Sequence, residues 1–155
     1  MARSPDVVHR PGDETGPGLA WRAFNWGAAL KSGALAGLIF LVIPQGSPWA
    51  SMTFASGAVM GRPVPSNVAL GIVLQMVLAI GYTLLIACAA RFVRSWRGIF
   101  VGGLVGLVLY FANFGIVQAT LPQYSGAEVR VLVTHIVFGM FAAALYKGMT
   151  SRSRH

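Results

Sequence analysis

The sequence predicts an all-α membrane protein, a four-transmembrane-helix bundle with an interfacial helical segment between the first two spans. Three observations predict this class. Hydrophobic residues make up 55% of the 155-residue chain and charged residues only 10%, and the mean hydropathy is +0.66, values far from those of soluble domains. Four long apolar runs are separated by polar or Pro/Gly-containing connections. The basic residues gather in these connections, so the formal charge of +8 does not indicate binding to nucleic acid.

The first span is expected at about 24–43, after a tail over residues 1–19. The tail is polar and interrupted by proline and glycine, which predicts a flexible cytoplasmic segment. Pro44 ends the span. Small residues recur at every fourth position of this span, at Ala29, Gly33 and Gly37. Such a face lets another helix approach closely, so the span is expected to pack on its neighbours.

Lys31 is a cation inside this first apolar span. It lies roughly 10 Å from the inner boundary at a rise of 1.5 Å per residue, within reach of the lipid headgroups. The alternative is a functional cation that faces a cavity between the helices.

The longest connection joins the first span to the second, which is expected at about 67–90. Its middle, about 49–60, is too short to cross a membrane but amphiphilic enough to lie along the outer interface. A lid or a re-entrant turn is the alternative. In the second span, Gln75 and Tyr82 are seven residues apart and therefore share one helix face.

The third span, about 98–119, and the fourth, about 128–147, complete the transmembrane domain, which covers residues 20–149. Glycines expected to pack against other helices occur at Gly98, Gly102, Gly106 and Gly139. A short tail, 150–155, follows the fourth span.

The distribution of charge predicts the orientation of the chain. Of the twelve Lys and Arg residues, only Arg62 and Arg130 fall on the predicted outer side. Ten positive residues against two favour cytoplasmic N- and C-termini. The four tryptophans all fall at predicted interfaces, as expected for a membrane protein.

A layer of polar side chains is the candidate site. Gln75, Asn113 and His135 each lie roughly 10 to 13 Å from the outer end of their own span, and Tyr110 lies one turn deeper. One interpretation is hydrogen bonding between helices. The other is a polar site for a small solute, a lipid headgroup or a quinone.

His135 is the candidate residue with the largest number of possible chemical roles. It is expected either as a neutral imidazole bonded across the bundle or as a proton-responsive group, since imidazole changes its charge near neutral pH. Haem or metal ligation would need a histidine from a second subunit, because no other ligand occurs at a suitable spacing.

The sequence contains no pattern typical of catalysis, of a cofactor site or of a metal site. No Asp or Glu lies in the core of any span, so the usual carboxylate of an ion-coupled carrier is missing. The glycines of the third span lack the Lys and Ser or Thr of a nucleotide loop. The single cysteine, Cys88, falls in an apolar run and is expected to be a small hydrophobic residue.

Three short motifs carry a resemblance to a known group of proteins. They are G-S-P-W at 46–49, Y-F-A-N-F at 110–114, and His135 with Phe138 and Gly139. In these, over about Gly27 to Tyr146, the chain resembles a family of small four-helix bacterial inner-membrane proteins that has no established activity. The resemblance implies a fold and a location only.

The expected function is that of a non-enzymatic structural or accessory subunit. The chain would associate through its glycine faces with itself or with a larger membrane complex in the lipid bilayer. The first alternative is a small oligomeric permease or channel-like protein that uses the polar layer. The second is a haem- or quinone-binding subunit.

Overall fold

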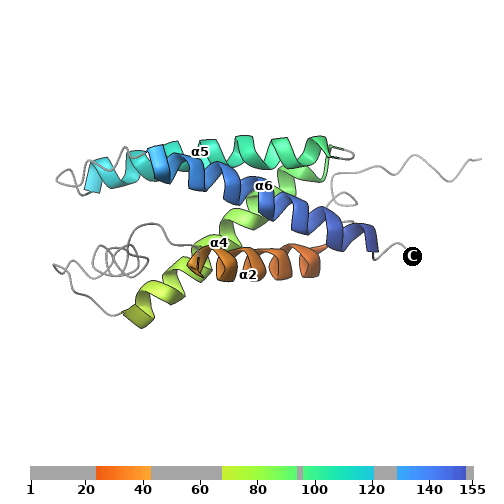
Figure 1. The fold of residues 1–155 in the computed structure, drawn as a ribbon, viewed down its shortest axis with the longest axis horizontal. Helices are drawn as coiled ribbons and strands as arrows, with labels where there is room; N and C mark the ends of the chain where they lie inside the picture. Colours follow the sequence, from red (N-terminus) through yellow and green to blue (C-terminus); the bar gives the residue numbers. More distant parts are fainter. Residues whose placement is uncertain (1–23, 43–67, 94–95, 121–128, 153–155) are drawn as a thin grey trace, which may run out of the picture.

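The computed structural model describes residues 24–42, 68–93, 96–120 and 129–152, and these ranges form four α-helices without a strand among them. The helices are α2 (Trp26–Val42), α4 (Val68–Ala90), α5 (Arg97–Thr120) and α6 (Val129–Arg152) (Figure 1). Three predicted features lie outside the described residues: the tail 1–19, the interfacial segment 49–60 and the G-S-P-W motif. Helix α6 continues through Arg152, so the first residues of the predicted tail 150–155 are helical.

Three of the four helices are long and apolar enough to cross a membrane. These stretches are Ala69–Ala90, Arg97–Ile116 and Val129–Ser151. Helix α2 is shorter, with 17 residues, or about 26 Å at 1.5 Å per residue, against a hydrocarbon core of about 30 Å. The first of the four predicted spans therefore corresponds to a helix that does not reach the usual length of a transmembrane helix within the described residues.

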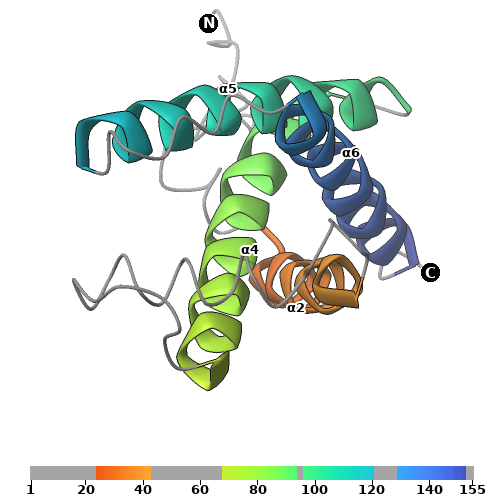
Figure 2. The same ribbon diagram turned by 60° about the vertical axis from the view of Figure 1, so that its left-hand side comes forward.

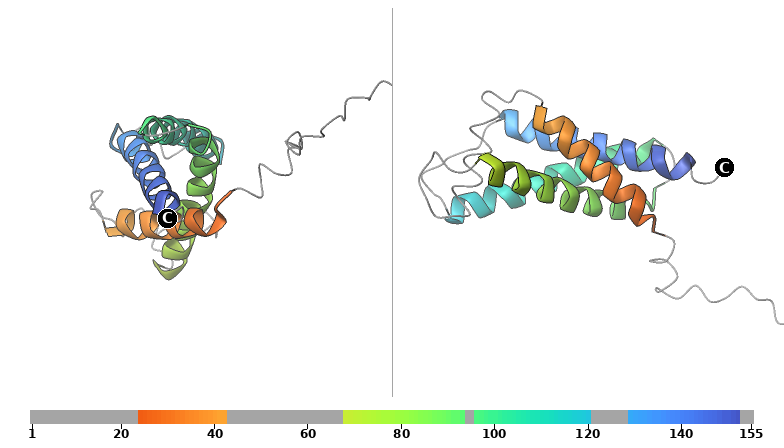
Figure 3. Two further views of the ribbon diagram at one scale, coloured as in Figure 1. Left: turned by 90° about the vertical axis from the view of Figure 1, so that its right-hand side faces the viewer. Right: turned by 90° about the horizontal axis from the view of Figure 1, so that it is seen from below.

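The helices α5 and α6 lie side by side and antiparallel, while α4 crosses the bundle at an angle (Figures 1 and 2). The middle of α4 packs on α2, and the end of α4 lies near the start of α5, as the two further views in Figure 3 also show. The first half of α4 therefore diverges from α5 and α6. This tilt decides which of its side chains reach the other helices.

The contact between α5 and α6 depends on glycine. A methyl group at Gly102 or Gly139 would collide with the backbone carbonyl of the other, and one at Gly106 would collide with the carbonyl of His135. Gly98 makes room for the side chain of Lys147 instead. The close approach of these two backbones is possible only because the positions lack Cβ atoms.

Small residues also form the contact between α2 and α4. Gly33 lies against Ile80 and Thr83, and Gly37 lies against Ala79 and Met76. The six glycines predicted to pack against helices thus lie between helices of the same chain. An association with another protein would have to use other surfaces.

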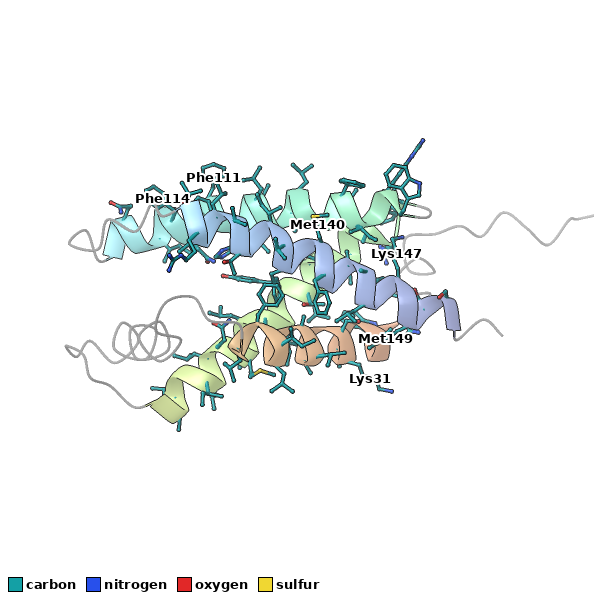
Figure 4. The ribbon with its side chains drawn as sticks, viewed as in Figure 1. Lys31, Phe111, Phe114, Met140, Lys147 and Met149 are labelled. Atoms are coloured by element: carbon teal, nitrogen blue, oxygen red, sulfur yellow. The ribbon has the colours of Figure 1, made fainter. Side chains whose placement is uncertain are left out.

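Large apolar side chains cover the outside of the bundle. On α5, residues at every third or fourth position are about 60% exposed: Phe100, Leu104, Val108 and Phe111. Figure 4 shows Phe111 pointing away from the other helices. An exposed apolar face of this kind would be unstable in water and is typical of a helix that contacts lipid.

Candidate functional site

Asn113 on α5 is the centre of a hydrogen-bonded group of side chains. Its Oδ1 accepts a hydrogen bond from the hydroxyl of Tyr82 on α4 at 2.5 Å. Its Nδ2 lies 2.9 Å from Nε2 of His135 on α6. We call these three residues, Tyr82, Asn113 and His135, the polar chain. It joins the three long helices through a single amide group.

The second ring nitrogen of His135 decides the direction of every bond in the polar chain. Nδ1 lies 2.9 Å from the carbonyl oxygen of Val131, one turn earlier in α6. A carbonyl can only accept, so the hydrogen is on Nδ1 and Nε2 accepts from the Asn113 amide. The amide oxygen is then free to accept from Tyr82. Each of the polar groups that meet in the polar chain has a partner of the opposite kind.

Two tyrosine rings enclose the imidazole of His135. The Tyr110 ring is edge-on to it, with centroids 5.7 Å apart and planes at 71°, and the Tyr82 ring lies 6.5 Å away. Tyr110 itself is buried and stacks on Phe114 at 6.2 Å. These rings restrict the orientation of the imidazole and surround it with apolar surface.

The local helix geometry brings Asn113 and His135 together. Side chains on a helix tilt toward its N-terminus. Because α5 and α6 are antiparallel, the Asn113 side chain and the His135 side chain lean toward each other along the contact. The contact is close because Gly106 lies directly against the backbone of His135. The glycine face therefore positions the polar chain.

The structure brings together three of the four residues of the predicted polar layer. Asn113 and His135 are hydrogen-bonded, and Tyr110 joins them through its ring. Gln75 is half-buried on α4, and no hydrogen bond of its side chain occurs within the described ranges. The residue of α4 that reaches Asn113 is Tyr82, two turns further along the same face.

The tilt of α4 explains why Tyr82 takes the place expected for Gln75. Residues at equal distances from the ends of their helices lie at the same depth only when the helix axes are aligned. The axis of α4 is tilted relative to those of α5 and α6 (Figure 1). Its first half diverges from α5, so a contact with Asn113 forms only deeper in the helix. The signal available in the sequence was the spacing of seven between Gln75 and Tyr82, which placed both side chains on one face.

Two buried hydroxyl groups lie in the contact between α2, α4 and α6. Ser32 is fully buried and donates to the carbonyl of Ala28 at 2.7 Å. Thr83 is also fully buried, and its hydroxyl has no hydrogen-bond partner within the described part of the chain. Thr83 packs against Gly33, and no pattern in the sequence distinguishes this hydroxyl from the others in the apolar runs.

Lys31 is exposed on α2, and its side chain points away from the other helices (Figure 4). This placement fits an ammonium that extends toward headgroups better than one that faces a cavity.

The chemistry available to the polar chain is limited. Within the described ranges, no three or more of His, Cys, Asp and Glu lie together as a metal site would require. Both ring nitrogens of His135 are hydrogen-bonded, so ligation of a haem iron would first have to break its bond to Asn113 or to Val131. The arrangement supports a fixed connection between helices.

Comparison with known proteins gives no relative from which a function could be inferred. No protein-family model, curated protein or solved structure matches the chain. The resemblance in the three short motifs stays a prediction.

Proposed function

We propose that the protein is a non-enzymatic structural or accessory component of a membrane assembly. The single observation that carries this proposal is the polar chain, in which the side chains of Tyr82, Asn113 and His135 are hydrogen-bonded to one another. A site for a solute or a substrate needs polar groups that are free to bind it. Here the Asn113 amide is bonded to Tyr82 and His135 on two other helices, and the second imidazole nitrogen is bonded within α6.

In this proposal the four helices form one transmembrane bundle in a bacterial inner membrane. Helix α2 is the first of the four spans, and local thinning of the bilayer accommodates its shorter length. The N- and C-termini lie in the cytoplasm, as the excess of Lys and Arg on that side of the sequence indicates.

The partner is a second copy of the chain or a larger membrane complex. The glycine faces lie between helices of the same chain, so we place the contact on the outer apolar faces. Purification in a mild detergent tests this role. We expect a fixed stoichiometric partner or a defined oligomer, detected by mass spectrometry and light scattering. A monodisperse, partner-free monomer would contradict the proposal.

Gln75 favours a second candidate function, a small oligomeric permease or channel-like protein. Its amide is half-buried and has no hydrogen bond within the described ranges, and an unpaired amide in lipid is costly. Water or a polar solute in contact with this amide would satisfy its hydrogen-bonding groups.

A transport assay separates the two functions. If the protein is a permease, the substitution Gln75→Leu changes solute flux into liposomes and leaves the unfolding temperature nearly unchanged. The matched control is the double variant Leu74→Gln with Gln75→Leu, which moves the amide to the neighbouring position of α4. Flux that is absent for the unmodified chain across a broad panel of solutes excludes this second candidate.

A further inference from the structure

One end of the bundle concentrates positive charge at the turn between α4 and α5. Helix α2 begins, α4 ends, α5 begins and α6 ends at this same end of the molecule (Figure 1). The described side chains there include three cations, Arg91, Arg97 and Lys147. We call these three residues the basic end.

Lys147 is held against the turn by a defined contact. Its Nζ donates a hydrogen bond to the carbonyl oxygen of Val93 at 2.5 Å. The side chain crosses α5 at Gly98, where a methyl group would collide with its Cε (Figure 4). An ammonium has three N–H donors, and the contact with Val93 uses one of them. The charge is thus fixed in position and retains two donors for another group.

Arg91 is the first residue of the same turn. Its guanidinium lies over the ring of Phe92, 4.4 Å from the centroid, and over the ring of Phe24 at 5.7 Å. Phe24 is buried and Phe92 is 73% exposed. Two ring faces orient the guanidinium plane. Two cations with defined orientations, those of Arg91 and Lys147, therefore lie at the turn formed by residues 91–93.

The charge of the basic end is positive within the part of the chain that the structure describes. The four carboxylate side chains of the sequence all lie outside that part, and they are Asp6, Asp13, Glu14 and Glu128. The three apolar stretches that are long enough to cross a membrane end or begin here, at Ala90, Arg97 and Ser151. In a bilayer this level is the level of the lipid phosphates.

Exposed aromatic rings lie beside these cations. Phe92, Trp96 and Phe100 are 73%, 61% and 59% exposed, and the last two form an edge-to-face pair with centroids 5.4 Å apart. Cations next to exposed aromatic surface suit a molecule with an anionic head and an apolar body, and a soluble anion would leave this surface uncovered.

We propose that the basic end binds the phosphate headgroup of an anionic phospholipid. Arg91 and Lys147 contact the phosphate, Arg97 adds attraction at the start of α5, and the rings of Phe92 and Trp96 lie against the glycerol and upper acyl chains. This site is separate from the polar chain and does not depend on the function proposed above.

Lipid titration of the purified full chain tests this site. Phosphatidylglycerol is compared with phosphatidylcholine in a neutral detergent, and binding is measured by native mass spectrometry. We expect tighter binding of phosphatidylglycerol, and about fivefold weaker binding for Arg91→Gln or Lys147→Gln, because each cation near a membrane surface contributes on the order of 1 kcal/mol. The matched control Arg130→Gln removes one charge at the opposite end of the bundle and should leave the affinity unchanged.

Four results would overturn the proposal. The first is equal binding of the two lipids, and the second is an equal loss in all three variants, which would indicate a diffuse effect of net charge. The third is displacement of phosphatidylglycerol by inorganic phosphate at equal concentration, which would indicate a site for a free anion. The fourth is a preference for phosphatidylglycerol that appears only after the acidic residues of the tail are replaced by Asp6→Asn, Asp13→Asn and Glu14→Gln together. That result would indicate that the cations of the basic end pair with the chain's own carboxylates.

A folding control separates a loss of lipid binding from a loss of structure. Glutamine at position 147 retains an N–H donor toward Val93, and unfolding in phosphatidylcholine checks that each variant is intact. If a variant at position 91 or 147 does not fold, Arg97→Gln replaces it, because Arg97 is exposed. An unchanged affinity of Arg97→Gln would then overturn the proposal.

Discussion

At the scale of single residues, the side-chain hydroxyls of the bundle differ in how much they contribute to its stability. The Tyr82 hydroxyl completes the polar chain by donating to Asn113. The Tyr110 side chain makes ring contacts with His135 and its neighbours. The Thr83 hydroxyl is buried without a partner in the described part. Removing each hydroxyl should therefore have a different effect on stability.

Tyr82→Phe should destabilise the protein, because it leaves Oδ1 of the half-buried Asn113 without its donor. The expected loss in the free energy of unfolding is about 0.5 to 1.5 kcal/mol. The measurement is reversible unfolding in mixed micelles. Tyr110→Phe is the matched control and should change the free energy by less than about 0.3 kcal/mol, since that hydroxyl has no hydrogen bond within the described ranges. Equal effects of the two substitutions would contradict the assignment of Tyr82 to the polar chain.

Thr83→Val should stabilise the protein by about 1 kcal/mol. The substitution keeps the branched shape that packs against Gly33 and removes a hydroxyl that is buried without a partner. Thr134→Val is the control, because the Thr134 hydroxyl donates to the carbonyl of Arg130 in its own helix. The same unfolding experiment checks both. Destabilisation by Thr83→Val would mean that its hydroxyl has a partner in the membrane.

At the scale of helices, the contact between α5 and α6 is the element on which the polar chain depends. Gly102, Gly106 and Gly139 let the two backbones meet, and this distance is what allows a short asparagine side chain to reach the imidazole. A change in the helix contact should therefore act on the hydrogen bond as well as on packing.

Gly102→Ala should separate α5 from α6 and destabilise the protein by about 2 kcal/mol or more, because the new methyl group would overlap the carbonyl of Gly139. The control is Gly115→Ala, also in α5, where a Cβ meets nothing within 4 Å. That substitution should be neutral or stabilising by up to about 1 kcal/mol, since alanine is the better helix former. Unfolding measurements on both variants check the pair. A destabilising Gly115→Ala, or a neutral Gly102→Ala, would contradict the assigned helix contact.

The helices were predictable from the sequence, and their angles were not. Apolar runs interrupted by proline and by basic turns gave ranges close to those of α4 and α5. The four-residue spacing of glycines indicated close helix contacts, and their partners within the chain required the structure. The tilt of α4 depends on the fit of many side chains, so the sequence pointed to Gln75 where the structure places Tyr82 against Asn113.

At the scale of the whole molecule, two regions with different chemistry lie apart along the bundle. The polar chain joins α4, α5 and α6 inside the apolar part. The basic end gathers cations where three of the apolar stretches end or begin. We propose that the first region stabilises the bundle and that the second binds lipid headgroups. In this proposal, one region anchors the protein at the membrane surface and the other fixes its helices relative to one another.

The energetic coupling between Asn113 and His135 tests this account most directly. It is measured by a double-mutant cycle of Asn113→Ala and His135→Ala, with unfolding followed in bilayer-like micelles. The account predicts a coupling free energy of about 0.6 to 1.7 kcal/mol, the range for hydrogen bonds between membrane helices. A coupling of zero, with each substitution alone leaving stability unchanged, would contradict a structural role for the polar chain.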